Sequence, residues 1–180
     1  MTSTTRFPTR RAFCRAASSG LAAALATGGG LMPGPARAAG ARQIEWDDLI
    51  PPGVPYGEIV GDGEIDVVND IWKPVYDENA LRLNEALNGE LIKLPGYIVP
   101  LEAGTKGVTV FLLVPYVGAC IHVPPPPPNQ LVVVEADPPW PSTDLWDAVW
   151  VSGTMRAETR ATDIAEAGYS IVADHIERFD

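Results

Sequence analysis

Five consecutive prolines, Pro124 to Pro128, constrain the fold of this 180-residue chain more than any other stretch. Each proline fixes φ near −65° and has no backbone N–H group, so the run forms a stiff rod without backbone donors. In a compact domain we interpret it as a rigid spacer between strands. The alternative is an exposed polyproline-II segment that docks into an aromatic groove of a partner. That alternative makes the run a partner-binding site: Pro124, Pro125, Pro126, Pro127 and Pro128.

A cysteine and a histidine stand directly before the prolines, in the order Gly-Ala-Cys-Ile-His-Val. Cys120 and His122 are two residues apart, and in an extended segment such side chains point to the same face. They can therefore share one metal ion. A thiolate and an imidazole suit zinc or copper. Copper carriers often add methionine, and Met155 is the only methionine after the N-terminal segment described below, so the pair favours zinc.

Two ligands do not hold a metal tightly, and a transfer site uses three protein ligands with one open position. Glu102, Asp137 and His175 are the further candidates, because strand ends converge in a small barrel. A fourth ligand would come from a second chain or a partner.

Two other interpretations of Cys120 and His122 stay open. In the first, the cysteine is buried and the histidine bonds a backbone carbonyl, which makes the motif a structural corner. In the second, His122 takes the thiol proton in a cysteine-dependent enzyme. No local signature of a cysteine hydrolase surrounds Cys120, and we rank this enzyme interpretation last.

The first 38 residues predict a cleaved export signal. Arg10 and Arg11 resemble the paired arginines of a twin-arginine signal, a weakly apolar run follows, and Ala36-Arg37-Ala38 fits the cleavage pattern. The segment holds five of the 13 basic residues and none of the 23 acidic ones. The other 142 residues therefore carry eight basic groups and a net charge of −15, which disfavours nucleic acid and anionic lipid as partners. We expect a soluble protein in the periplasm.

Beyond residue 89 the apolar pattern has a period of two. It predicts five strands, at residues 91–101, 108–116, 131–135, 148–155 and 168–176, with bends at Gly96 and Gly153. The strand at 108–116 is apolar on both faces and should be central. Residues 156–167 form either a short helix or a long hairpin connection. The pattern predicts a mainly β fold, a small five-stranded antiparallel barrel of the oligonucleotide/oligosaccharide-binding (OB) type, with a β-sandwich as the alternative.

Residues 39–74 predict an irregular N-terminal arm, because glycine and proline recur every few residues. Trp46 and Leu49 should pack this arm onto the body, as should Trp72. A stripe at spacings of four, three and four predicts one amphipathic helix from about residue 74 to 87. The domain division is thus 1–38, 39–74 and 75–180, the last being helix plus barrel. Three tryptophans, Trp140, Trp146 and Trp150, are candidates for a stacking platform or for cover of the barrel.

Several stretches together resemble an exported bacterial family known as a domain of unknown function, family 3299. They are Trp-Asp-Asp-Leu-Ile-Pro at 46–51, Leu-Pro-Gly-Tyr-Ile-Val-Pro-Leu-Glu at 94–102, the Gly-Ala-Cys-Ile-His-Val-polyproline-Asn-Gln signature, Val-Trp-Val-Ser-Gly-Thr at 149–154 and Ala-Gly-Tyr at 167–169. The resemblance implies periplasmic zinc handling beside an ABC-type transporter and a periplasmic metal-binding protein. It also ranks Glu102 above His175 as the third ligand.

We therefore expect a non-enzymatic periplasmic zinc-binding protein, accessory to or carrier for a transporter-linked system. Its predicted ligands are Cys120, His122 and Glu102, and its predicted partner is a periplasmic metal-binding protein or an ABC-transporter component. The alternative of a different class is a scaffold component of an envelope transporter complex that binds no metal.

Overall fold

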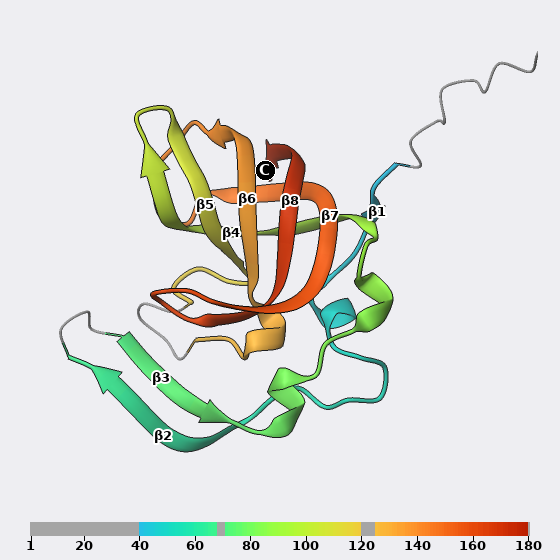
Figure 1. The fold of residues 1–180 in the computed structure, drawn as a ribbon, viewed down its shortest axis with the longest axis vertical. Coiled ribbons are helices and arrows are strands. Elements are labelled where there is room, and N and C mark those ends of the chain that lie inside the picture. Colours follow the sequence, from blue (N-terminus) through green and yellow to red (C-terminus); the bar gives the residue numbers. More distant parts are fainter. Residues whose placement is uncertain (1–39, 68–70, 120–124, 180) are drawn as a thin grey trace, which may run out of the picture. The chain divides into compact units, whose positions relative to one another are not determined.

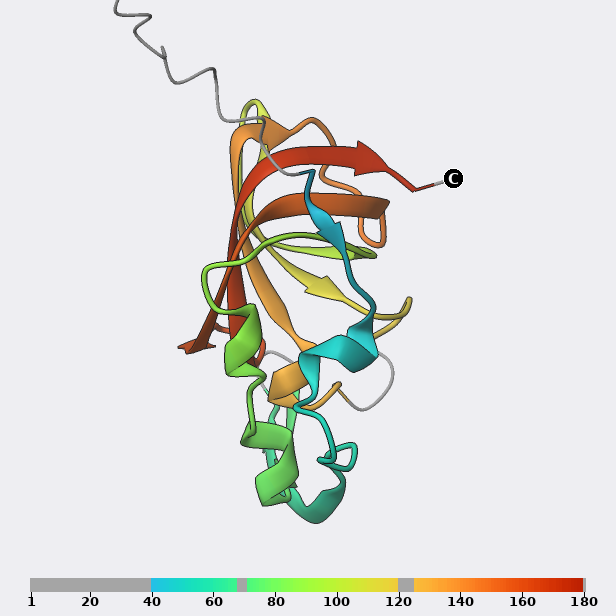
Figure 2. The same ribbon diagram turned by 90° about the vertical axis from the view of Figure 1, so that its right-hand side faces the viewer.

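The computed structural model describes residues 40–67, 71–119 and 125–179, which belong to one unit, Ala39–Asp180 (Figures 1 and 2). The predicted export signal and five residues of the signature, 120–124, lie outside the described residues; Cys120, His122 and Pro124 are among these five. No helix in the described part is long and apolar enough to cross a membrane.

Five strands close into a barrel, as the apolar period of two predicts. They are β4 (Leu91–Gly104), β5 (Gly107–Val114), β6 (Val132–Trp140), β7 (Ala148–Ala161) and β8 (Glu166–Arg178). Their order is β4-β5-β6-β8-β7, and β7 pairs again with β4 to close the sheet. The barrel is mixed, since β6 and β8 run parallel while the other barrel pairs are antiparallel. The antiparallel prediction is wrong for that one pair, because β8 inserts between β7 and β6.

The barrel wall is apolar on both sides in its β4–β5–β6 part. On β5, Phe111 and Leu113 pack inside the barrel, while Leu112 and Val114 belong to a second apolar cluster on the outer side. All four are fully buried, which confirms β5 as a central strand. This outer cluster is covered by parts of the connections between strands, among them Ala119 and Trp146.

Two glycines mark the predicted bends. Gly153 lies at a shift in the β7–β8 register, and a Cβ atom there would sit 2.2 Å from the Val172 carbonyl oxygen. At Gly96, β4 is about to change partners: residues Leu91–Tyr97 pair with β7, and pairing with β5 begins at Tyr97. The segment 156–167 is a long β7–β8 hairpin and not a helix.

The first part of the predicted arm packs on the barrel as expected. Its short strand β1 (Arg42–Gln43) pairs parallel with β4, and the 3-10 turn η1 (Trp46–Leu49) follows. Leu49 is fully buried, and the Trp46 indole N–H donates to the Pro95 carbonyl oxygen at 2.8 Å.

The second part of the arm is not irregular. Strands β2 (Ile59–Asp66) and β3 (Ile71–Tyr76) form a two-stranded antiparallel sheet, hereafter the ribbon (Figure 1). Trp72 lies on β3 and donates its indole N–H to the Asp62 carbonyl oxygen on β2. The Trp72 indole N–H is therefore bonded within the ribbon, and packing of Trp72 onto the body stays a prediction.

The predicted helix at 74–87 is present only as two 3-10 turns, η2 (Glu78–Leu81) and η3 (Glu85–Leu87). The Asp77 carboxylate accepts from the amides of Asn79 and Ala80, and the Asn84 side chain accepts from the Ala86 amide. Each cap starts a new turn, which divides the segment into two short pieces. The apolar stripe still packs inward, because Ala80 and Leu87 are buried.

Candidate functional site

The segment that carries Cys120 and His122 joins the end of β5 to the start of β6. On its N-terminal side, Ala119 is fully buried in the outer apolar cluster. On its C-terminal side, the Pro125 carbonyl oxygen accepts a hydrogen bond from the Tyr76 hydroxyl of β3. Both flanks of the five residues 120–124 are therefore fixed to the rest of the fold.

Asn129 and Gln130, which end the signature, tie the proline run to the 3-10 turns. The Asn129 amide donates to the carbonyl oxygens of Asn79 (2.9 Å) and Arg82 (3.2 Å), at the end of η2. The Gln130 amide donates to the Trp46 carbonyl oxygen in η1 at 2.9 Å. Both side chains are buried, so these bonds give their amide N–H groups the partners that buried polar groups need. This end of the signature has a structural role.

The described prolines do not form an exposed rod. Pro126, Pro127 and Pro128 are buried and Pro125 is half-buried, and Pro128 begins the turn η4 (Pro128–Gln130). These four are therefore not displayed for a partner's groove in the way the partner-binding interpretation requires. Three of them, Pro125, Pro126 and Pro128, form part of a pocket wall.

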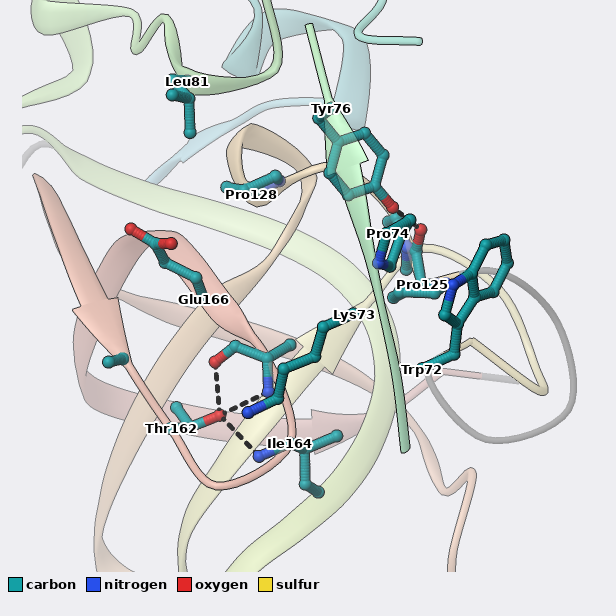
Figure 3. A pocket seen from close by; sticks show the side chains of 13 residues that line it. Trp72, Lys73, Pro74, Tyr76, Leu81, Pro125, Pro128, Thr162, Ile164 and Glu166 are labelled. Atoms are coloured by element: carbon teal, nitrogen blue, oxygen red, sulfur yellow. Dashed lines mark hydrogen bonds between the residues drawn. The ribbon is translucent and has the colours of Figure 1, made fainter. Parts of the chain in front are cut away.

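That pocket, of about 340 Å³, lies between β3, the proline run and the tip of the β7–β8 hairpin (Figure 3). Its walls are mostly apolar, with one lysine and one glutamate. Among the residues that line it are Trp72, Tyr76, Leu81, Pro125, Pro128 and Ile164. Lys73 and Glu166 also line it. Such a wall accommodates an apolar group beside a charged one.

The hairpin tip opposite β3 is held by one threonine. The Thr162 hydroxyl donates to the Ala165 carbonyl oxygen at 2.6 Å and accepts from the amides of Ile164 and Ala165 (Figure 3). Sequence reasoning missed this pocket, because it assigned Trp72 to the irregular arm and Tyr76 to a helix. The available signal was the pair of short apolar runs around Asn69-Asp70, a dipeptide typical of turns.

Glu102, the predicted third ligand, lies near the β4–β5 turn and is exposed. It pairs with Val110 in the β4–β5 ladder, whereas Val114, where the chain leaves β5 toward Cys120, pairs with Tyr97. Five residues of β4 between Tyr97 and Glu102 correspond to about 17 Å. Its role as a ligand stays a prediction.

Asp137 and His175, the other ligand candidates, line one shallow depression together with Asp174. The His175 imidazole is exposed and its Nε2 atom lies 3.6 Å from a Glu177 carboxylate oxygen. Asp137 follows Val132, the first residue of β6 after the proline run, by five residues, or about 17 Å. Among the described residues, no three Cys, His, Asp or Glu side chains form a group that could hold a metal.

The three candidate platform tryptophans are engaged in packing. Trp140 is buried and donates its indole N–H to Asp147 at 2.8 Å. Trp146 packs against the outer apolar cluster. The Trp150 ring meets Phe179 edge-on, with ring centroids 5.3 Å apart. They cover the barrel, and the stacking-platform alternative is not supported.

Loss of the Asn129 side chain should weaken the fold locally. We expect Asn129→Ala to lower the free energy of unfolding by about 1–3 kcal/mol, because the Asn79 and Arg82 carbonyl oxygens lose a buried donor. Urea denaturation measures it. Asn88→Ala is the control: Asn88 is exposed and accepts one 3.3 Å bond from the Ala157 amide, so a change within about 0.5 kcal/mol is expected. Equal effects of the two substitutions would contradict the anchoring role.

The comparisons with known proteins agree with the sequence resemblance. The family described as "Protein of unknown function (DUF3299)" matches residues 46–178. A crystal structure of a DUF3299 family protein from Pseudomonas aeruginosa PAO1 is similar, with 37% sequence identity and a TM-score of 0.62. The match covers 78% of this chain and 97% of that one. None of the curated proteins matches the chain.

Proposed function

The chain belongs to the DUF3299 family, and we propose that this member is a non-catalytic periplasmic zinc-binding protein. Cys120 and His122 supply two ligands to the metal, with Glu102 as the proposed third. The protein passes zinc to or from a periplasmic metal-binding protein or an ABC-transporter component. Zinc is cargo in this proposal, so a ligand set with one open position is an advantage.

The observation that supports the proposal is the anchoring of both flanks of the Cys-Ile-His segment. Ala119 is buried before it, and Pro125 is bonded by Tyr76 after it. A short connection fixed at both ends restricts where a thiolate and an imidazole two residues apart can lie. Restricting the ligands before binding lowers the entropy that metal binding costs. Cys120 has no cysteine to pair with after export, and a metal would protect its thiolate from oxidation.

Elemental analysis of the mature protein, purified from the periplasm without affinity histidines, tests the proposal. We expect close to one zinc per chain, and loss of that zinc in Cys120→Ser and in His122→Ala. His175→Ala is the matched control, because it removes the other histidine of the chain and should leave the zinc in place. Glu102→Gln should weaken zinc binding without abolishing it if Glu102 is the third ligand.

No retained metal, even after zinc is added and the excess removed, would overturn the proposal, as would zinc that persists in both Cys120→Ser and His122→Ala. Circular dichroism of each variant shows whether the fold is intact, so that lost zinc is not confused with unfolding. We also expect slow alkylation of Cys120 in the metal-free protein. Fast alkylation would indicate the reactive thiolate that a cysteine-dependent enzyme holds.

A scaffold function in an envelope transporter complex is the second candidate. The burial of Pro126 to Pro128 and the bonds of Asn129 and Gln130 favour it, because they give most of the described signature a structural use. Under this function the protein co-purifies with its membrane partner in the presence of a chelator. Under the zinc function, chelation weakens that association.

A further inference from the structure

The ribbon has an unpaired outer edge. Among the described residues, β2 pairs only with β3, so no strand lies along its other side. The residues that the ribbon contributes to the pocket beside the barrel, Trp72, Lys73, Pro74 and Tyr76, all come from β3. The barrel is therefore on the β3 side, and the edge of β2 is open. Two strands alone form a marginal sheet in water, which a third strand would stabilise.

Large apolar side chains are exposed on this strand. Of the twelve exposed large hydrophobic residues in the described chain, Ile59, Val60 and Ile65 are in β2, and Val67 follows it. Ile65 is 67% exposed and lies opposite Trp72, whereas Val75, 51% exposed, lies opposite Gly61. Clustered apolar exposure of this kind marks an interaction surface.

The same strand is acidic. Asp62 and Glu64 are exposed on it, Glu58 is exposed directly before it, and β2 contains no lysine or arginine. Two such edges would place like charges opposite each other, which is destabilising in a strand pair. Register shifts between Ile59 and Gly61 and between Gly61 and Glu64 also interrupt the regular edge. Acidic residues at an edge disfavour pairing with a second copy, and they leave a basic partner as the occupant.

We propose that the open edge of β2 binds an extended segment of a partner protein in which basic and apolar residues alternate. The segment adds a third strand alongside β2. Its apolar side chains pack near Ile65, and its basic side chains lie near Glu64 and Asp62. This interaction needs no zinc and does not depend on the proposed function.

Fluorescence anisotropy with three labelled peptides tests this inference on the mature protein, in chelator and at physiological ionic strength. The first probe alternates lysine and valine over seven residues, the second alternates glutamate and valine, and the third alternates lysine and serine. We expect the lysine–valine peptide to bind at least tenfold more tightly than either other peptide. Ile65→Ser and Glu64→Lys should each weaken this binding at least tenfold.

Val172→Ser is the matched control, because Val172 is 51% exposed on β8 of the barrel. It should leave the affinity unchanged. Equal weakening by Val172→Ser and Ile65→Ser, equal binding of the lysine–serine peptide, or no binding of the lysine–valine peptide would overturn the proposal. Light scattering provides a further test: a dimer that becomes a monomer in Ile65→Ser would make a second copy the occupant, against the proposal.

Discussion

Gly107→Ala should lower the free energy of unfolding by about 3–5 kcal/mol, since two separate costs add. Gly107 begins β5 with a φ of +122°, a backbone conformation that residues with side chains rarely adopt. A Cβ atom there would also sit 1.8 Å from the Trp140 carbonyl oxygen of β6. This contact is with backbone, so no side-chain rotation relieves it. The β5–β6 ladder must shift where Val108 pairs with Trp140.

Gly104→Ala is the control for this prediction. Gly104 pairs with Gly107 in the same β4–β5 turn, but nothing lies within 4 Å of a Cβ atom placed there. We expect a change within about 0.5 kcal/mol. Urea denaturation of both variants gives the comparison. A Gly107→Ala protein as stable as Gly104→Ala would show that the close approach of Trp140 to this turn is not present in solution.

The barrel could be predicted from the sequence because each strand carries its own apolar pattern. Alternation of apolar residues marks each strand, and the doubly apolar run at Phe111 to Val114 marks a strand covered on both sides. Gly153, inside the apolar run of β7, lies at a register shift between β7 and β8. The parallel β6–β8 pair could not be predicted, because alternation identifies a strand without identifying its neighbour.

The ribbon was missed for a related reason. Gly61 and the Asp62-Gly63 pair interrupt the alternation, and they read as loop punctuation. In the structure Asp62 and Gly63 lie at a register shift of β2, and Gly61 still pairs with Val75. The prediction of a helix at 74–87 was wrong for a different reason. Its apolar stripe is correct, but the caps at Asp77 and Asn84 each begin a separate 3-10 turn. Side-chain bonds to the backbone decided the local structure where apolar period alone did not.

The candidate site, too, could be predicted from the sequence only in part. Asn129 and Gln130 stood in the signature next to the metal-ligand pair, and sequence gave no reason to separate them from it. Their bonds to Asn79, Arg82 and Trp46 depend on turns that are 47 to 84 residues away. Such long-range contacts cannot be read from residue types and spacing. In the described part of the signature, these contacts leave fewer side chains with a possible chemical role.

Tyr169→Phe should lower the free energy of unfolding by about 2–4 kcal/mol, because two backbone groups lose the hydroxyl that pairs with them. Tyr169 is fully buried on β8. Its hydroxyl donates to the Leu49 carbonyl oxygen at 2.5 Å and accepts from the Asn84 amide at 2.6 Å. One phenol thus joins η1 and the start of η3 to the barrel. Tyr56→Phe is the control, because Tyr56 is 49% exposed, and a change within about 0.5 kcal/mol is expected at neutral pH.

The same residue gives the fold a limit at high pH. Burial raises the pKa of Tyr169 from 10.0 to about 12, and burial with the nearby Tyr116 and Asp47 raises the pKa of Tyr56 to about 12 as well. Between these values the unfolded chain loses phenol protons that the folded chain retains. The stability is therefore complete below pH 10 and falls as the pH rises to 12.

Urea denaturation from pH 8 to pH 12 measures this decline. In Tyr169→Phe the curve starts lower, because the two hydrogen bonds are absent at every pH. It should also fall less steeply above pH 10, because only Tyr56 still contributes its shift. In Tyr56→Phe the curve should start near the wild-type value and likewise fall less steeply. Wild-type and Tyr169→Phe curves with the same slope above pH 10 would mean that Tyr169 ionises as freely in the folded protein as in the unfolded chain. Burial of the phenol would then not hold it in its neutral form.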